Sequence, residues 1–112
     1  MTTVRFEKDA EKGVLSMEVL GHTGFAEAGK DPVCAGASTL AMTVAQCVKT
    51  MEEAGRLQKN AHIVIRNGRV LVTAKPKPEH LQETRHLFWV GETGMRLLAE
   101  AYPDHIEIRS GG

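Results

Sequence analysis

The stretch IVIRNGRVLVTA, residues 63–74, gives the clearest indication of the fold. Two runs rich in β-branched residues, 63–66 and 69–74, flank the pair Asn67 and Gly68. This pair accepts the positive φ angles of a type I′ turn, which joins two neighbouring antiparallel strands. The sequence therefore predicts a β-hairpin at residues 63–74.

Strands are also expected toward both ends of the chain. Residues 4–8 and 14–20 have the composition of strands, and the polar segment 9–13 is expected to form the turn between them. Ile106 and Ile108 alternate with charged residues. This alternation predicts a last short strand.

Two helices are expected between these strands. The first, residues 35–54, has apolar residues at helical spacing, namely Leu40, Val44, Val48 and Met51. The second follows the proline-punctuated segment 75–78 and has one side formed by Leu81, Thr84, Phe88, Gly91, Met95, Leu98 and Ala101. Gly91 and Gly94 each lower helix stability relative to alanine, which indicates close packing or a break near residues 90–94.

The predicted order of elements is ββαββαβ. Strands that are mostly neighbours in sequence pair antiparallel, and two amphipathic helices need one common surface to cover. We therefore expect an α+β fold with two layers, in which two helices cover one face of a mostly antiparallel sheet. The 112 residues, 42% of them hydrophobic, suit a single domain over residues 1–112.

The overall charge indicates no partner, although a local charged patch stays possible. Lys plus Arg and Asp plus Glu number 14 each, so no net charge of the whole chain attracts nucleic acid or an anionic membrane. The first 20 residues lack the apolar run of a signal peptide, and no run of about 18 apolar residues is present. A cytoplasmic protein with reduced thiols is expected, with no membrane and no nucleic acid partner required.

The loop GHTGFAEAGKDPVC, residues 21–34, carries the residues that point to chemistry. Cys34 at the start of a helix is a candidate nucleophile, because free backbone N–H groups and the helix dipole favour its thiolate. The N–H groups of Cys34 or Ala35 are also candidates to receive an oxyanion. His22, at the end of a strand, is the candidate general base.

Asp31 and Ser38 are the candidate supporting residues. Asp31 would either orient His22 or cap the helix, and we favour the cap. Ser38 lies one helical turn after Cys34. Its hydroxyl would hydrogen-bond either near the thiol or back to the carbonyl of Cys34.

The glycines of the loop predict a gate over the site. Gly24 and Gly29 allow backbone angles that other residues avoid, and Phe25 is a candidate substrate contact. We expect residues 24–31 to become ordered when substrate binds. Without substrate, His22 and the thiol would then be too far apart to hydrogen-bond.

The other cysteine and histidines show no spacing typical of a metal site. No metal and no cofactor are therefore expected. The residues interpreted as structural or exposed are Cys47, His62, His80, His86 and His105.

Residues 21–38, GHTGFAEAGKDPVCAGAS, resemble the signature of the ribosomal-processing cysteine protease family Prp. That signature has Gly-His, a glycine-rich loop, Asp-x-Val-Cys-Ala and a serine. The similarity continues in the hairpin 63–74 and in GMRLLAEAYP, residues 94–103. It covers essentially the whole chain.

The resemblance implies a function and a set of site residues. His22 and Cys34 would be the catalytic pair, with Asp31 and Ser38 near them, and residues 24–31 would close over the substrate. The family removes a short N-terminal extension from a large-subunit ribosomal protein, number twenty-seven in the usual count. Its members are homodimers.

A homodimer is also indicated by the hairpin. Ile63, Val64 and Ile65 place apolar side chains on both faces of the sheet, and two helices cover only one face. Two other functions stay open. One is a non-catalytic, ribosome-associated binding protein with the same fold, and the other is a redox-sensing domain in which Cys34 is oxidised reversibly.

Overall fold

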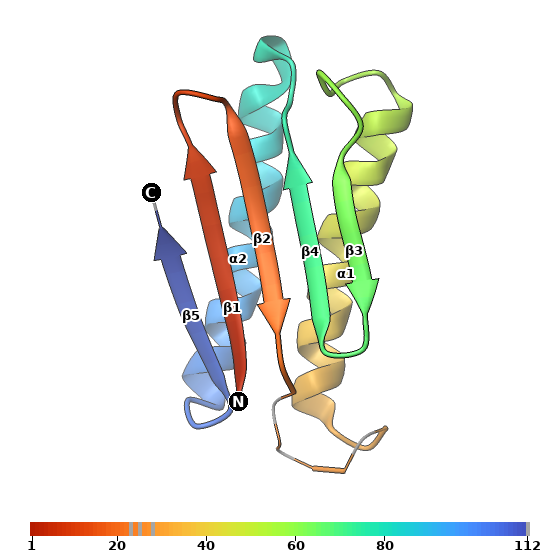
Figure 1. The fold of residues 1–112 in the computed structure, drawn as a ribbon. Coiled ribbons are helices and arrows are strands. Elements are labelled where there is room, and N and C mark those ends of the chain that lie inside the picture. Colours follow the sequence, from red (N-terminus) through yellow and green to blue (C-terminus); the bar gives the residue numbers. More distant parts are fainter. Residues whose placement is uncertain (23, 25, 28, 112) are drawn as a thin grey trace.

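The structure is a computed structural model and describes residues 1–22, 24, 26, 27 and 29–111. Its elements are β1 (Thr2–Asp9), β2 (Val14–Leu20), α1 (Pro32–Glu53), β3 (His62–Arg66), β4 (Arg69–Ala74), the short 3₁₀ helix η1 (Pro78–His80), α2 (Leu81–Ala101) and β5 (Ile106–Gly111) (Figure 1). The predicted ββαββαβ order and the α+β fold class are confirmed.

The five strands form one sheet in the order β3-β4-β2-β1-β5. Only the β1–β5 pair is parallel, and the other three pairs are antiparallel, so the mostly antiparallel sheet is confirmed. β1 begins before the predicted strand 4–8 because Thr2 and Thr3 pair with Ile106 and Glu107 of β5. The N-terminal strand is thus held on both sides.

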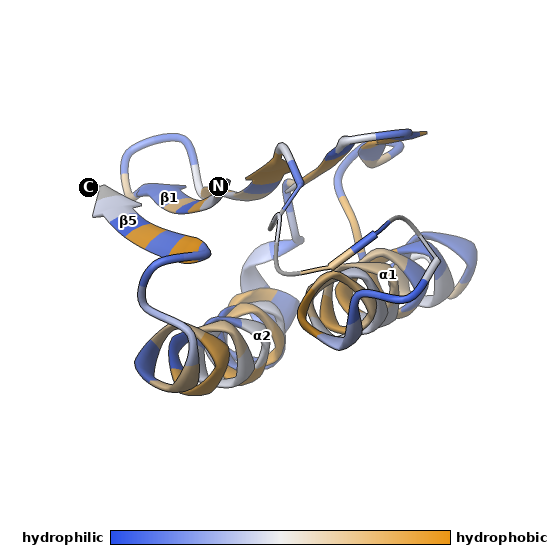
Figure 2. Ribbon diagram, turned by 90° about the horizontal axis from the view of Figure 1, so that it is seen from below, coloured by the Kyte–Doolittle hydropathy of each residue, from blue (hydrophilic) through white to orange (hydrophobic). Residues whose placement is uncertain are grey.

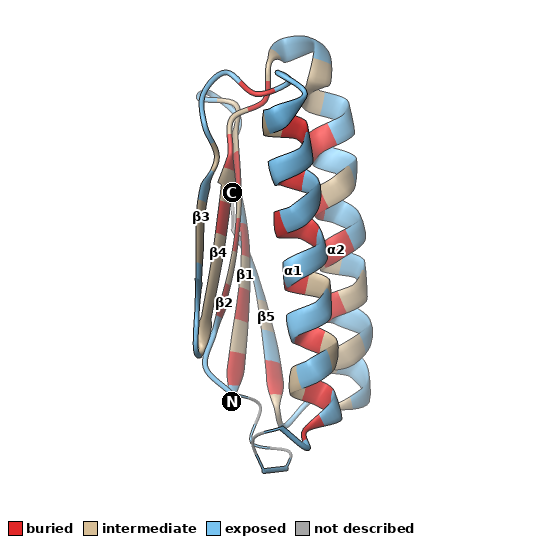
Figure 3. Ribbon diagram, turned by 90° about the vertical axis from the view of Figure 1, so that its right-hand side faces the viewer, coloured by how far each residue is buried: buried red, intermediate tan, exposed pale blue. Residues whose placement is uncertain are grey.

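Both helices cover the same face of the sheet. Figure 2 shows the two layers end-on, with the sheet above the helices, and Figure 3 shows buried residues on the sides that face each other. The core between the layers is apolar and includes Val4, Phe6, Met17, Val44, Val48, Val72, Phe88 and Met95, each at most 6% exposed. No helix in the described part of the chain is long and apolar enough to span a membrane.

Gly91 and Gly94 are explained by close packing of α2 on α1. A Cβ at Gly91 would lie 2.6 Å from Cγ2 of Val44, and one at Gly94 would lie 2.7 Å from Cδ2 of Leu40. Since α2 runs from Leu81 to Ala101 without interruption, the predicted alternative of a break near residues 90–94 is wrong. Ala101, predicted on the apolar side, is the last helical residue and is exposed.

Replacing Gly91 by valine is expected to lower the free energy of unfolding by about 1–3 kcal/mol, because the added carbons must displace Val44 in a close-packed core. Urea denaturation would measure the loss. Thr93→Val is the matched control, since it places the same side chain on the exposed side of α2. Equal losses in the two variants would contradict the packing explanation.

The hairpin β3–β4 forms one edge of the sheet. Its register pairs Ile63 with Val72 and Ile65 with Val70, on the side of the sheet that faces the helices. Val64 pairs with Leu71 on the opposite face, as the alternation of side chains requires. Ile65 is nevertheless 51% exposed, because β3 is an edge strand.

A carboxylate connects the end of α1 to the start of β3. The Glu52 side chain bonds to Lys49 and accepts a hydrogen bond of 2.6 Å from the backbone N–H of Ala61. The bond from Lys49, and after it the backbone bond, hold the pKa of Glu52 below its usual range. This contact helps to place the β3–β4 hairpin relative to α1.

Candidate active site

The position of His22 is set by the glycine that precedes it. Gly21 has a φ of +89°, and a Cβ there would lie 2.6 Å from the backbone oxygen of Met1. The N–H of Gly21 donates a 2.8 Å hydrogen bond to the carbonyl of Gly68, in the β3–β4 turn. The chain therefore leaves β2 between Met1 and this turn, and only glycine fits at that point.

Asp31 is the N-cap of α1. Its Oδ1 accepts hydrogen bonds of 2.9 Å from the backbone N–H groups of both Val33 and Cys34, and Pro32 occupies the first helical turn. The helix consequently begins three residues before the predicted start at residue 35.

Asp31 also occupies the two backbone donors expected to bind an oxyanion. The N–H of Cys34 is bonded to the Asp31 side chain, and the N–H of Ala35 donates to the Asp31 carbonyl at 3.0 Å. The expectation that one of these two donors is free for an oxyanion is therefore wrong for the structure without substrate.

His22 and Cys34 lie at the same end of the molecule, where β2 leaves the sheet and α1 begins (Figure 1). His22 is exposed, whereas Cys34 is half-buried. Within the described residues no hydrogen bond joins the two side chains. Gly24 and Gly29 have φ angles of +69° and +83°, which favour glycine at both positions.

Phe25, predicted to contact substrate, lies outside the described residues. Ser38 is exposed on α1, one turn after Cys34. In the described part of the chain, its hydroxyl makes neither of the two predicted hydrogen bonds. Ser38 lines a shallow hollow of about 460 Å³ together with Thr39, Met42, Thr43, Gln46 and Cys47. Both cysteines are free thiols.

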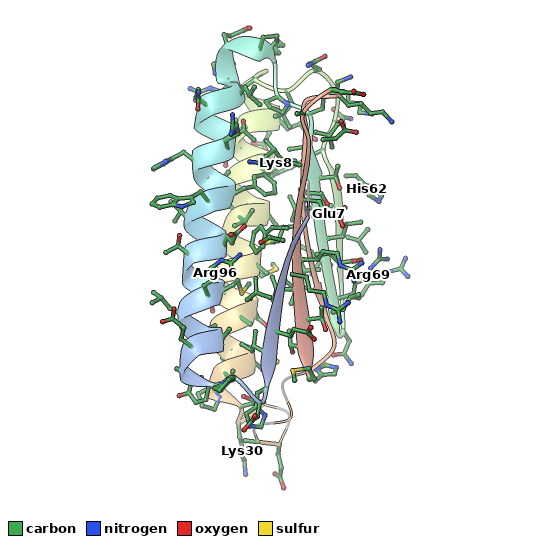
Figure 4. All side chains as sticks on the ribbon, turned by 90° about the vertical axis from the view of Figure 1, so that its left-hand side faces the viewer. Glu7, Lys8, Lys30, His62, Arg69 and Arg96 are labelled. Atoms are coloured by element: carbon green, nitrogen blue, oxygen red, sulfur yellow. The ribbon has the colours of Figure 1, made fainter. Side chains whose placement is uncertain are left out.

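A larger hollow of about 1030 Å³ lies between α2 and the β1–β2 hairpin. It is lined by Phe6, Leu15, Phe88 and Trp89, and by charged residues that include Glu7, Lys8 and Arg96. Figure 4 shows Glu7 and Lys8 well away from Lys30, which marks the loop before α1. This hollow contains neither His22 nor Cys34, so it is separate from the candidate site at the start of α1.

Sequence reasoning missed two features of this surface. One is the contact of Gly68 with His22, since the Asn67–Gly68 pair indicates a turn but not what the turn touches. The other is the exposure of Trp89, 59% of which is accessible to solvent. Trp89 directly follows Phe88, which lies on the apolar side of the helix. The helical pattern therefore places Trp89 outside that apolar side, which is a weak indication of its exposure.

Comparisons with known proteins identify the family. A family model described as cysteine protease Prp matches residues 1–107. The Staphylococcus aureus essential ribosomal processing protease Prp, in complex with a covalently linked product peptide, is similar with a TM-score of 0.77 and 20% identity, over 99% of this chain and 100% of that chain.

The same protease in complex with a substrate peptide gives a TM-score of 0.69 at 20% identity, over 99% of this chain and 100% of that one. SMU.848 from Streptococcus mutans gives 0.67 at 26% identity, over 98% and 93% of the two chains. No curated protein sequence matches the chain. The family match spans nearly all of the sequence and agrees with the fold, so this chain belongs to the cysteine protease family Prp.

Proposed function

We propose that this protein is the endopeptidase that removes the N-terminal extension of large-subunit ribosomal protein twenty-seven during ribosome maturation. The observation that carries the proposal is the match of residues 1–107 to the Prp family. The similar S. aureus protein is described as a ribosomal processing protease and has been solved with substrate and product peptides. We place the reaction in the cytoplasm.

In the proposed mechanism, Cys34 is the nucleophile and His22 is the general base. Sγ of Cys34 attacks the carbonyl carbon of the scissile peptide bond, and His22 accepts the thiol proton. The C–N bond breaks, and His22 passes the proton to the leaving amine, which leaves an acyl thioester on Cys34. Water that loses a proton to His22 then hydrolyses the thioester and restores the thiol.

The glycine loop is proposed to complete this pair. Since no hydrogen bond joins His22 to Cys34 among the described residues, the bond would form when the peptide closes residues 24–31 over the site. The positive φ angles of Gly24 and Gly29 support a loop that can adopt such conformations. Phe25 would contact the peptide, and the exposed hydroxyl of Ser38 would lie beside it.

Asp31 is proposed to support the site through the helix. Its carboxylate fixes the backbone of Cys34 by the 2.9 Å bond to the N–H. The cap thereby holds the nucleophile at the start of α1, where the helix dipole favours the thiolate.

The test is cleavage of a peptide that contains the N-terminal extension and the first mature residues of ribosomal protein twenty-seven from the same organism. We expect one cut, detected by mass spectrometry, with no added metal or cofactor. Binding of the folded protein without a cut would favour the ribosome-associated binding protein. Reversible oxidation of Cys34 without a cut would favour the redox-sensing domain.

A homodimer is part of the proposal. Ile65 is 51% exposed and Leu20 is 39% exposed, at the β3 edge and at the end of β2, and helices cover only one face of the sheet (Figure 3). A second copy would cover such apolar surface. Light scattering at micromolar concentration is expected to give twice the 12.2 kDa mass of the chain. A mass of one chain would contradict this prediction.

A further inference from the structure

The tip of the β3–β4 hairpin lies against the ring of His22. A Cβ built on Gly68 would lie 3.1 Å from Nε2 of His22, and 3.8 Å from both Cδ2 and Cε1. The carbonyl of Gly68 also accepts the 2.8 Å hydrogen bond from Gly21, the residue before His22. The turn therefore lies close to the imidazole ring, and its hydrogen bond to Gly21 holds the backbone just before His22.

Two separate properties of glycine are used at position 68. Its φ of +77° lies in the left-handed region, as the turn requires. Its missing side chain leaves room for the imidazole ring. Gly13, in the β1–β2 turn, shares only the first property, because its φ is +65° but a Cβ there would have no atom within 4 Å. The space at Gly68 is therefore not explained by turn geometry alone.

We propose that Gly68 is a positioning residue for His22. The Asn67–Gly68 turn would form the surface against which the imidazole ring is held, and we call this surface the seat of His22. The inference rests on the proposed role of His22 as general base. A base must be placed within hydrogen-bond reach of the group it deprotonates, and small displacements are costly to the rate.

In a Cys-His-acid site, a carboxylate commonly orients the imidazole. Here Oδ1 of Asp31 is engaged by the N–H groups of Val33 and Cys34. Oδ2 accepts a hydrogen bond of 3.4 Å from the backbone N–H of Ala26. The hairpin turn is a separate neighbour of the ring, on the side of Gly68. Gly68 acts through His22 and does not itself take part in the reaction.

The test uses Gly68→Ala and Gly68→Asn, with Gly13→Ala and Gly13→Asn as matched controls. Alanine adds both backbone strain and a Cβ that crowds the ring, whereas asparagine tolerates positive φ but brings the same Cβ to 3.1 Å from Nε2 of His22. Comparison of the two substitutions therefore separates turn strain from displacement of the imidazole. If Gly68→Ala does not fold, Gly68→Asn still carries the test.

Three quantities are measured on each variant: the midpoint of urea unfolding, the NMR signals of the His22 ring, and kcat and KM for the extension peptide. The two alanine variants are expected to lose similar amounts of stability. Only the Gly68 variants should shift the His22 signals and lower kcat, by about 10- to 100-fold, with KM changed less than twofold. The Gly13 variants should retain wild-type signals and kcat.

His22 signals that stay at their wild-type positions in both Gly68 variants would overturn the proposal. Shifted signals with an unchanged kcat would overturn it as well, since the contact would then have no part in positioning the base. If the wild-type protein does not cleave the peptide, but the Gly68 variants alone shift the ring signals, the proposed protease function fails and the seat for His22 is supported.

Discussion

Replacing Cys34 by alanine is expected to lower the rate of cleavage of the extension peptide by about 1000-fold or more, to a small residual rate. The thiol is the only group in the proposed mechanism that forms a bond to the substrate, so no other side chain can take its place. The variant should still fold, because Cys34 is only half-buried and alanine suits the first turn of a helix. The assay is the mass-spectrometric measurement of the cut, and circular dichroism checks the fold.

Cys47→Ala is the matched control for this variant. Cys47 is an exposed free thiol on the same helix, and it lines the same shallow hollow as Ser38. Its replacement should leave the cleavage rate unchanged. Turnover close to the wild-type rate in a clean Cys34→Ala preparation, or loss of turnover in Cys47→Ala, would remove Cys34 from the role of nucleophile.

The elements of the fold are predictable from the sequence because their signals are local. Asn67 and Gly68 specify a turn by residue type, and the spacing of Val44, Val48 and Met51 specifies one side of a helix. The element bounds are less predictable. α1 starts at Pro32 because the Asp31 carboxylate bonds to the next N–H groups, a contact that depends on side-chain geometry.

Contacts between residues far apart in the chain are not predictable in the same way. Glycines inside a helix pattern indicate either a break or close packing, and only the position of Val44 on α1 decides for packing at Gly91. The seat of His22 is a similar case. Gly68 is 46 positions further along the chain, and its contact with the ring follows from the antiparallel pairing of β2 with β4.

At the candidate site, the residue types are predictable but their hydrogen bonds are not. A histidine at a strand end and a cysteine at a helix start suggest a nucleophile and its base from sequence alone. The same reasoning expects free N–H groups at the start of α1. That expectation fails because Asp31 accepts from both donors, from the N–H of Cys34 with its carboxylate and from the N–H of Ala35 with its carbonyl.

Replacing His22 by alanine is expected to lower kcat by about 100-fold or more, because the thiol of Cys34 then loses its general base and the leaving amine loses its proton donor. The ring is exposed, so stability should change little. His62→Ala is the matched control, since His62 is an exposed histidine on β3 and has no role in the mechanism.

The double variant His22→Ala/Cys34→Ala tests whether the two residues act as one unit. The base serves only to activate this nucleophile and to complete its reaction, so its loss should cost nothing further once the thiol is absent. The double variant should therefore be no slower than Cys34→Ala alone, measured with the same peptide. A double variant markedly slower than either single variant would mean that His22 stabilises the transition state independently of Cys34, for example by binding the peptide. In that case the seat at Gly68 would position a substrate contact and not a base.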